Sequence, residues 1–153
     1  MLNHDGYASL THLYDAAINQ SRWRRALDAV ASAVGGEAIA LLIRRADPSF
    51  KDLTMLNSAY LGLTRTPAGI YYGLVLSRLQ NPDWEFLSRQ PVHHPTPDTA
   101  IGPTAEQLDK RRDYAFLRKR LGISRRLGIR LNSDKVWFDA MSIAFSSEHS
   151  NAP

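Results

Sequence analysis

Two short segments near the end of the chain carry side chains that could hold a small ligand. Arg126 and Arg130 lie in the first segment, and Trp137 and Asp139 lie in the second. On neighbouring strands an arginine can stack on an indole ring and pair with a carboxylate. Such a surface combines a flat aromatic platform with charges that orient a bound molecule, so it could form the floor of a ligand pocket. A structural salt bridge under a covering helix, or a contact between two copies of the chain, would explain the same residue types equally well.

The alternation of residue types predicts that the two segments form a β-hairpin. The first strand runs from Ile123 to Asn132 and the return strand from Lys135 to Phe145. A two-residue loop at Ser133-Asp134 would connect them. The pairs that this loop predicts are Leu131 with Val136, Ile129 with Phe138 and Leu127 with Ala140. One sheet face is then aliphatic, and the four candidate residues share the other face. A shift by one residue would bury the Asp139 carboxylate without a partner, at a cost on the order of several kcal/mol.

Two amphipathic helices open the chain. The first carries an apolar stripe with spacings of three, four and three residues, formed by Tyr7, Leu10, Tyr14 and Ala17. Ser21 is a candidate N-cap for the second helix, which Gly35-Gly36 ends. The apolar stripe of the second helix consists of Trp23, Leu27, Val30 and Val34. We therefore expect the apolar face of each helix to pack against another element of the protein or against a second chain.

The middle of the chain predicts further strands and helices. The apolar run 38–43 is typical of a central strand, and 53–61 of a weaker strand. Thr66-Pro67 begins a predicted helix that stops near Asn81-Pro82, with one more turn around Trp84. Four prolines keep residues 90–103 extended.

A last predicted helix precedes the hairpin. It runs from the capping box at Thr104 to Leu121 and stops at Gly122. Together the elements indicate an α+β fold, in which an antiparallel sheet of about five strands is flanked by helices on both faces. We expect a single domain over residues 1–146, and residues 147–153 as a tail or linker.

Composition narrows the class of protein. The 153 residues fit one domain, and 44% apolar with 22% charged residues is typical of a globular chain. The absence of cysteine excludes disulfides, thiolate metal sites and a cysteine nucleophile, and it fits a reducing, cytoplasmic location. The longest apolar run, Ala38 to Ile43, is too short to cross a bilayer, and the first residues carry no export signal.

The sequence contains no recognisable catalytic motif. It lacks the Gly-x-Ser-x-Gly elbow of many hydrolases, and Gly35-Gly36 lacks the Lys-Ser/Thr that follows in a phosphate loop. His93 and His94 are adjacent in an extended segment, so their side chains point in opposite directions and no third metal ligand stands at a suitable spacing. We therefore expect no enzyme, no metal and no cofactor.

A basic stretch between residues 110 and 130 offers a different function. It holds nine of the 19 lysine and arginine residues, with Tyr114 and Phe116 interleaved. Such a stretch could bind the phosphates of a nucleic acid. A solvated helix face followed by an outer strand face would explain the same charges.

Four stretches of the chain resemble the N-terminal sensory domain of bacterial LuxR-type transcriptional regulators. They are Leu13-Tyr-Asp-Ala-Ala17 with Ser21-Arg-Trp23, Arg111-Arg-Asp-Tyr-Ala-Phe-Leu117, Leu121-Gly-Ile-Ser-Arg-Arg-Leu-Gly-Ile-Arg-Leu131 and Val136-Trp-Phe-Asp-Ala140. The resemblance implies a PAS/GAF-like sheet with helices and a small-molecule sensor that acts with a helix-turn-helix module. No helix-turn-helix pattern lies within these 153 residues. Tyr71, Tyr72, Asp83 and Trp84 do not follow the residue order of the family's lactone receptors, so no lactone is implied.

The resulting hypothesis is a regulatory domain that binds a small organic effector. The effector would lie between the sheet and the helices of residues 67–87, and its binding would alter helix packing or a homodimer interface. In the family's architecture the helical segment would roof the sheet. The candidate ligand-binding residues are Tyr71, Tyr72, Trp84, Arg126, Trp137 and Asp139. The alternatives are a ligand-free dimerisation module and a nucleic-acid binder that uses the basic stretch.

Overall fold

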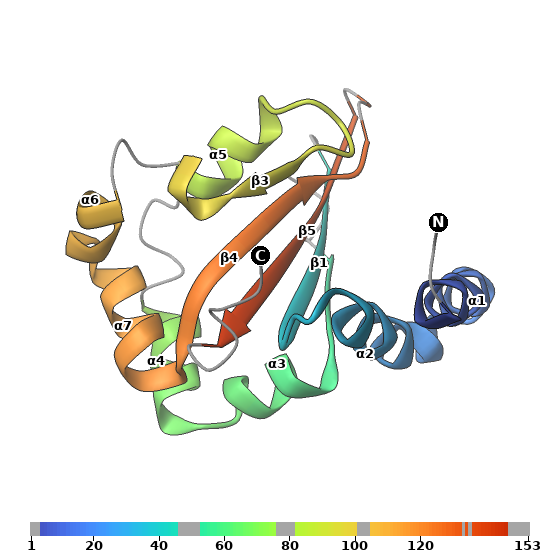
Figure 1. The fold of residues 1–153 in the computed structure, drawn as a ribbon, viewed down its shortest axis with the longest axis horizontal. Coiled ribbons are helices and arrows are strands. Elements are labelled where there is room, and N and C mark those ends of the chain that lie inside the picture. The colour runs from blue at the N-terminus through green and yellow to red at the C-terminus, as the bar shows by residue number, and fades with distance from the viewer. Residues whose placement is uncertain are drawn as a thin grey trace.

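The computed structural model describes residues 4–45, 53–75, 82–100, 105–132, 134 and 136–146. An antiparallel sheet of five strands forms the centre, in the order β2-β1-β5-β4-β3, and helices cover both faces (Figure 1). The α+β architecture predicted from the sequence is therefore confirmed. The strands are β1 (Ala38–Arg45), β2 (Leu53–Leu56), β3 (Pro95–Pro97), β4 (Ile123–Arg130) and β5 (Trp137–Ser146).

The predicted register of the β4–β5 hairpin is wrong. Ile129 pairs with Met141 instead of Phe138, three residues further along β5. A shift by an odd number of residues moves every side chain of β5 to the opposite face relative to β4. Trp137 and Asp139 therefore share the face of Leu127 and Ile129, whereas Arg126 and Arg130 point to the other face.

The observed register follows from the position of β5 between two partners. Its apolar residues continue the rows of β1 and β4 on one face, as Ile39–Ile143–Leu127 and Leu41–Met141–Ile129. These rows form the first core together with Leu27 and Ala31 of α2 (Trp23–Val34). Asp139 continues this face next to Ile43, and the side chain of Asn132 donates a hydrogen bond of 2.7 Å to its Oδ2. That bond offsets part of the cost that the sequence argument assigned to burying this carboxylate.

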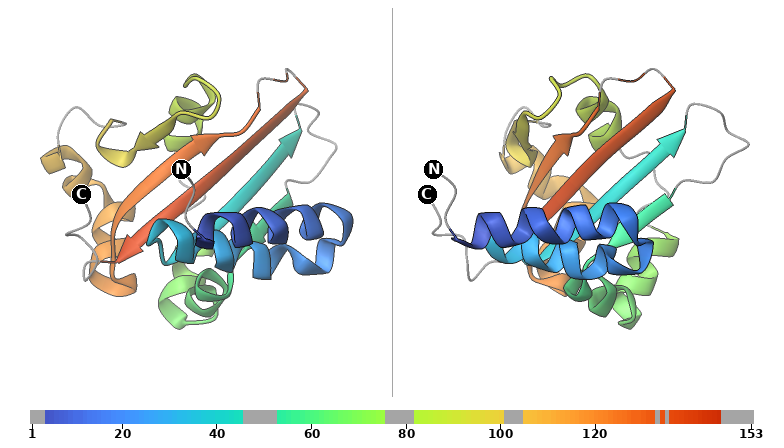
Figure 2. Two further views of the ribbon diagram at one scale, coloured as in Figure 1. Left: turned by 45° about the vertical axis from the view of Figure 1, so that its right-hand side comes forward. Right: turned by 90° about the vertical axis from the view of Figure 1, so that its right-hand side faces the viewer.

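Helices α1 (His4–Ile18) and α2 form a pair that lies across this first face (Figure 2). Helix α2 packs against β1 and β2, and α1 is joined to α2 by a hydrogen bond of 3.0 Å from the Ser9 hydroxyl to the carbonyl oxygen of Ala29. The N-cap predicted at Ser21 is wrong, because Gln20–Arg22 forms a 3₁₀ turn that Asn19 caps. The end of α2 at Gly35 is confirmed, with a positive φ of 67° that suits glycine.

The outward stripe of α1 is exposed rather than buried. Leu10, Tyr14 and Ile18 are 41%, 74% and 90% exposed, and Ala17 is exposed as well. These residues include most of the apolar stripe that the sequence singles out. The described part of the chain therefore leaves this stripe without a covering element.

The second face of the sheet is covered by the helices of the middle of the chain. A second core joins Ala38 and Ala144 of the sheet to Leu117 of α7 (Arg112–Leu121). The helices on this side are α3 (Ser58–Thr64), α4 (Pro67–Leu74), α5 (Pro82–Ser88), α6 (Ala105–Lys110) and α7, and α6 packs against α7. Thr66 caps α4 as predicted, through a hydrogen bond of 3.0 Å from Gly69 N–H to its hydroxyl. The helix that was expected to continue to Asn81-Pro82 ends early, because α4 stops at Leu74 with Val75 as its C-cap. The capping box at Thr104 and the C-terminal tail lie outside the described residues.

Two further element boundaries differ from the sequence prediction, and one side chain lies on the other face of the sheet. The strand expected over 53–61 stops at Leu56, because Asn57 caps α3. The helix expected over 104–121 is divided at Arg111 into α6 and α7, although Gly122 ends it as predicted with a φ of 67°. Ile123 packs in the second core despite its parity, because the β4–β5 register shifts between Ile123 and Arg125.

The edge strand β3 is short and rich in proline. Pro95 and Pro97 are exposed, and Thr96 between them is buried. The strand pairs with β4 through Thr96 and Gly128. The preceding turn is held by His93, whose backbone N–H donates to the carbonyl oxygen of Arg130 at 2.8 Å.

Asn57 joins β1 to the start of α3 and should contribute measurably to stability. Its buried Oδ1 accepts hydrogen bonds from the backbone N–H groups of Ile39 and Tyr60, and its Nδ2 donates to the carbonyl oxygen of Glu37. We expect Asn57→Ala to lower the free energy of unfolding by about 2 kcal/mol, because it leaves a buried donor unpaired and removes an N-cap. Urea denaturation would measure this. Asn19→Ala, which removes an exposed cap, should cost less than half as much, and equal losses would contradict the role of burial.

Candidate functional site

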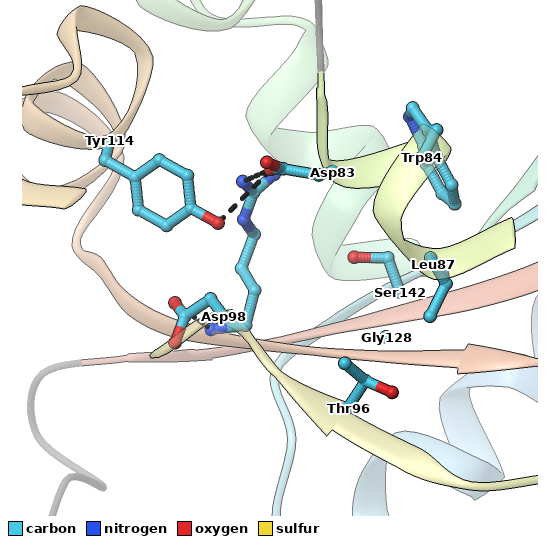
Figure 3. Close-up of a pocket in the computed structure, with 9 residues that line it drawn as sticks. Asp83, Trp84, Leu87, Thr96, Asp98, Tyr114, Gly128 and Ser142 are labelled. Carbon is cyan, nitrogen blue, oxygen red and sulfur yellow. Dashed lines mark hydrogen bonds and ion pairs between the residues drawn. The ribbon is translucent and has the colours of Figure 1, made fainter. Parts of the chain in front are cut away.

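A pocket opens on the second face of the sheet, between β4, β5, β3 and the helices α5 and α7 (Figure 3). Its cavity volume is about 40 Å³, which is room for roughly three water molecules. The lining residues are Asp83, Trp84, Leu87, Thr96, Asp98, Tyr114, Arg126, Gly128 and Ser142. The pocket therefore lies between the sheet and the helical segment, as the sequence hypothesis expects.

Each wall follows from local structure. Trp84 and Leu87 are three residues apart on α5, so they point to the same side of this helix. The ring of Trp84 meets Phe138 edge-on, with centroids 6.4 Å apart. Gly128 leaves space on β4, since a Cβ there would lie only 3.0 Å from a methyl group of Leu87. Small residues on the strands thus let α5 approach the sheet closely.

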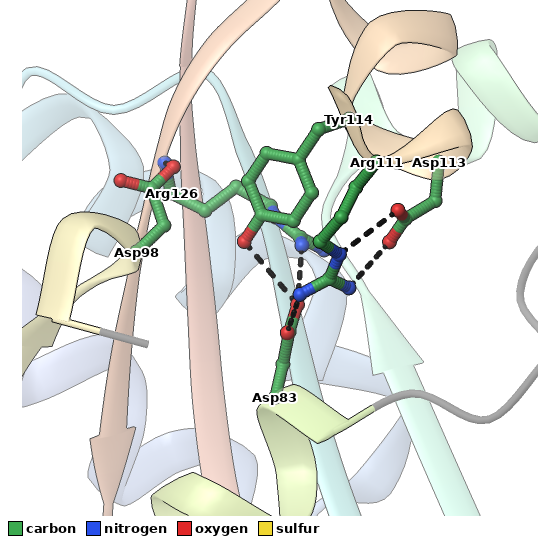
Figure 4. A network of polar contacts seen from close by, with 6 residues as sticks. All are labelled: Asp83, Asp98, Arg111, Asp113, Tyr114 and Arg126. Carbon is green, nitrogen blue, oxygen red and sulfur yellow. Dashed lines mark hydrogen bonds and ion pairs between the residues drawn. The ribbon is translucent and has the colours of Figure 1, made fainter. Parts of the chain in front are cut away.

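Asp83 is the centre of a buried network of charges (Figure 4). Its Oδ1 lies 2.5 Å from Nη1 of Arg111, and its Oδ2 lies 2.6 Å from Nη2 of Arg126. The hydroxyl of Tyr114 donates a hydrogen bond of 3.2 Å to Oδ2. Arg111 also forms a bidentate ion pair with Asp113, in which Nε and Nη2 each donate a hydrogen bond to the carboxylate. One carboxylate on α5 thereby connects the start of α7 with strand β4.

Within the network, the Arg126 guanidinium stays charged and the Tyr114 hydroxyl stays protonated. Burial opposes the charge of Arg126, but Tyr114, Tyr72 and Asp83 around it raise its pKa above the ordinary value. Burial also raises the pKa of Tyr114, against the lowering effect of Arg126, so the phenol stays a hydrogen-bond donor at neutral pH. The guanidinium carbons of Arg126 and Arg111 lie 4.4 and 4.7 Å from the centroid of the Tyr114 ring. These contacts stabilise both cations, of which Arg126 lines the pocket.

The structure places two of the six predicted site residues on this pocket. Trp84 and Arg126 line it. Tyr72 lies in the second core, where burial raises its pKa to about 12 although the charge of Arg126 lowers it. Tyr71 is 45% exposed and its ring contacts Phe116.

Trp137 and Asp139 lie on the opposite face of the sheet, because the register differs from the predicted one. The grouping of these two residues with Arg126 was wrong. The ligand-binding role of each predicted residue stays a prediction, and only the pocket-lining pair has the geometry that the hypothesis assumed.

Asp83, Asp98 and Tyr114 are three of the seven lining residues that sequence reasoning did not select. Asp83 stands beside the selected Trp84, and Tyr114 lies within a stretch that carries the family resemblance. Asp98 had no local signal beyond its position among prolines. It accepts a hydrogen bond of 2.9 Å from the backbone N–H of Arg126, 28 residues away.

No protein-family model matches the chain, and no curated protein matches it either. Among solved structures, the LBD (ligand-binding) domain of VqsR from Pseudomonas aeruginosa is similar, with a TM-score of 0.64 at 15% sequence identity. The alignment covers 95% of this chain and 82% of that one. The chain shares the fold of the VqsR domain. At this identity the similarity concerns the fold.

The basic stretch divides into internal and external charges. Arg111 and Arg126 belong to the buried network, and Arg130 donates to the backbone carbonyl oxygens of Asn132 and Gln90. The last turn of α7 carries Arg118, Lys119 and Arg120, all exposed, where cations suit the helix dipole. The stretch is therefore not one continuous cationic surface.

The described residues contain neither a helix that could span a membrane nor a cluster of side chains that could hold a metal ion. None of the helices that the structure describes has the length and apolar composition that crossing a bilayer requires. Within the same ranges, no group of three or more His, Asp or Glu side chains is placed to hold a metal ion.

Asp98 makes the stability of the site depend on pH. Burial raises the pKa of Asp98, although hydrogen bonding and charge from Arg126 lower it. A carboxyl group with a higher pKa in the folded chain binds its proton more tightly there, so the fold loses stability as the pH rises through that pKa. We expect Asp98→Asn, which keeps an acceptor for the Arg126 N–H, to be at least as stable as the wild type at neutral pH.

Urea denaturation between about pH 4 and 7 would test this expectation. The advantage of Asp98→Asn should shrink towards the acid end, where the wild-type carboxyl group is protonated. The exposed substitution Glu106→Gln is the control for a general change in net charge. An Asp98→Asn variant that is less stable than the wild type at neutral pH would show that the ionised carboxylate stabilises the fold.

Proposed function

We propose that this chain is the small-molecule-sensing domain of a LuxR-type transcriptional regulator. It binds an organic effector in the pocket between the sheet and α5, and it transmits binding through helix packing. DNA is contacted by a helix-turn-helix module outside these 153 residues. The domain is a cytoplasmic regulatory module and not an enzyme.

The pocket at Arg126 is the observation that carries the proposal. It lies where the helical segment covers the sheet, and it combines the aromatic and aliphatic walls of Trp84 and Leu87 with convergent polar groups. Pockets with this composition are typical of small-molecule sites. The shared fold with a ligand-binding domain and the sequence resemblance to sensory domains support the same function.

The charge network suggests how binding is transmitted. Asp83 lies in the first turn of α5, one residue before Trp84, and it bonds both Arg111 and Arg126. An effector that presses on Trp84 displaces α5 and hence Asp83. The arginines must then reorganise, which links occupancy of the pocket to the position of α7. An effector biases this equilibrium only by its different affinity for the two arrangements.

A thermal-shift screen with a pocket-filling variant tests the proposal. We expect at least one compound of a metabolite library to raise the melting temperature of the wild type. The rise should disappear in Ser142→Leu, whose side chain enters the pocket, and persist in the control Ser32→Leu on the exposed side of α2. A screen without stabilising compounds, or hits that Ser142→Leu leaves unchanged, would contradict binding in this pocket.

A homodimer formed through α1 is a second candidate function. The exposed positions from Leu10 to Ile18 carry no charged side chain, and three large apolar residues lie there at spacings of four. An exposed apolar stripe of this kind is typical of helix–helix association. The face with Trp137 cannot provide the dimer contact that the sequence analysis considered, because its arginines point to the other side of the sheet.

Sedimentation of charged variants tests this second candidate. We expect a wild-type dimer, and monomers for Tyr14→Glu and Ile18→Glu. Val136→Glu is the matched control, since Val136 is 56% exposed at the hairpin, away from α1. A wild type that sediments as a monomer at every concentration would refute the dimer.

A further inference from the structure

The free edge of β2 presents main-chain groups to solvent. β2 is the outermost strand at the end of the sheet opposite β3. Asn57, directly after β2, donates its backbone N–H to the carbonyl oxygen of Ile39 at 3.1 Å, so its main chain faces β1. Main-chain groups alternate between the two sides of a strand, and those of Thr54 and Leu56 therefore face away from β1. No hydrogen bond to another described residue occupies these outward groups.

The two edges of the sheet differ in their ability to accept a further strand. At β3, two of the three residues are proline. β2, with the sequence Leu-Thr-Met-Leu, has neither a proline nor a charged side chain, which are the common protections of an edge strand. Leu53 and Thr54 are exposed. β2 can therefore pair with an incoming strand where β3 cannot.

An open groove lies at the free edge of β2. Its volume is about 330 Å³, and its lining includes residues 54–56 of β2, Trp23 and Arg24 of α2, and Leu61 of α3. Trp23 packs on the first core, whereas α3 belongs to the second face, so helices of both faces border the groove. Figure 2 (right) shows β2 at the edge of the sheet beside the helix pair of α1 and α2. An extended segment beside β2 would thus have contacts for its side chains.

Arg24 gives the groove a positive charge. Its side chain is exposed and forms no ion pair or hydrogen bond with a described residue. The first turn of α2 holds no acidic residue, and a cation is unfavourable at a helix N-terminus. Arg22 bonds Asp15, whereas Asp28, one turn after Arg24, lies outside the groove lining and accepts two hydrogen bonds from Ser58. A carboxylate in the groove would therefore pair with Arg24 and interact favourably with the helix dipole.

We propose that the free edge of β2 binds an extended acidic segment of a partner protein, which adds a sixth strand to the sheet. The main chain of the segment pairs with Thr54 and Leu56, and one of its carboxylates pairs with Arg24. Strand addition of this kind takes its affinity from main-chain hydrogen bonds and its specificity from side-chain contacts. The surface is separate from the effector pocket, since no residue lines both.

Two five-residue peptides test the proposal. They are Val-Glu-Val-Glu-Val and Val-Lys-Val-Lys-Val, each acetylated and amidated at its ends, and each is titrated into the ¹⁵N-labelled chain. We expect the Glu peptide to shift the amide resonances of Thr54 and Leu56 saturably and to slow their hydrogen exchange. The Lys peptide should bind at least about fivefold more weakly, because it places a like charge beside Arg24.

Variants separate the main-chain pairing from the charge. Thr54→Pro removes an outward N–H and keeps the bonds between β2 and β1, so affinity for the Glu peptide should fall at least about fivefold. Thr54→Val, which keeps the N–H, should bind like the wild type. A Glu peptide methylated on its central amide nitrogen should bind the wild type more weakly, and this measurement does not depend on the folding of a variant. Arg24→Glu should reverse the preference between the two peptides, whereas Arg120→Glu on α7 should preserve it.

Several results would overturn the proposal. One is a Glu peptide that moves no resonance of β2. Another is binding that both Thr54→Pro and the methylated peptide leave unchanged, or an equal affinity for the Glu and Lys peptides. Amide protection at Thr54 and Leu56 that rises with protein concentration, without any peptide, would show that a second copy occupies the edge instead. The thermal-shift screen tests the effector pocket independently of these results.

Discussion

Asp83→Ala should lower the free energy of unfolding by about 3–5 kcal/mol, the range for removing one partner of a buried ion pair. The Asp83 side chain is 12% exposed, and it contacts Arg111, Arg126 and Tyr114 from three different elements. Its loss leaves the 18% exposed Arg126 side chain without an ionic partner on its guanidinium. Equilibrium urea unfolding, followed by tryptophan fluorescence, would measure the change.

Two further variants distinguish the cost of an unpaired buried charge from the cost of the lost hydrogen bonds. Asp113→Ala should cost only about 1–2 kcal/mol, because Arg111 keeps Asp83. The double variant Asp83→Ala/Arg126→Met should recover part of the loss of Asp83→Ala, since an apolar pair in place of a buried ion pair is often neutral or stabilising. Additive losses in the double variant would contradict a coupled network.

Gly69→Ala should destabilise the protein by at least about 3 kcal/mol, although alanine favours a helix by about 1 kcal/mol over glycine. A Cβ at this position would lie 1.9 Å from the carbonyl oxygen of Leu63 and 2.7 Å from its carbonyl carbon. Both atoms belong to the backbone, so α3 and α4 must separate to make room. Chemical denaturation would reveal the loss.

Gly73→Ala is the matched control in the same helix. A Cβ there meets nothing within 4 Å, so only the helix propensity remains. We expect Gly73→Ala to stabilise the protein by up to about 1 kcal/mol. If both variants change stability in the same direction, the close approach of α3 and α4 at Gly69 does not have the predicted consequence.

Local signals predicted most helices and strands correctly. The alternation in β4 assigned Arg126 to one face and Leu127 to the other, because side chains of a strand alternate whatever its partner is. Gly35 and Gly122 ended their helices as predicted, since both adopt the left-handed conformation that other residues disfavour. The division of the last helix at Arg111 had no such signal. It follows from the contacts of Arg111 with Asp83, which lies 28 residues earlier.

The register of β5 depends on its pairing with β1, which is distant in the sequence, and local sequence patterns did not predict it. The hairpin prediction weighed β4 against β5 alone, whereas β5 also pairs along its length with β1. Met141 and Ile143 must therefore lie on the face that α2 covers, and Asp139 follows with them. The same limit explains the site. Trp84 and Arg126 could be selected by residue type, but the bond between Asp83 and Arg126 joins residues that are 43 positions apart.

The edge strand β3 limits how copies of this protein can associate. Pro95 and Pro97 have no N–H to offer, so two of its three residues cannot donate to a further strand. Growth of the sheet past this side, as in edge-to-edge aggregates or fibrils, is therefore blocked. The two prolines thus protect the edge nearest the pocket against polymerisation, and none of the described elements is needed to cover it.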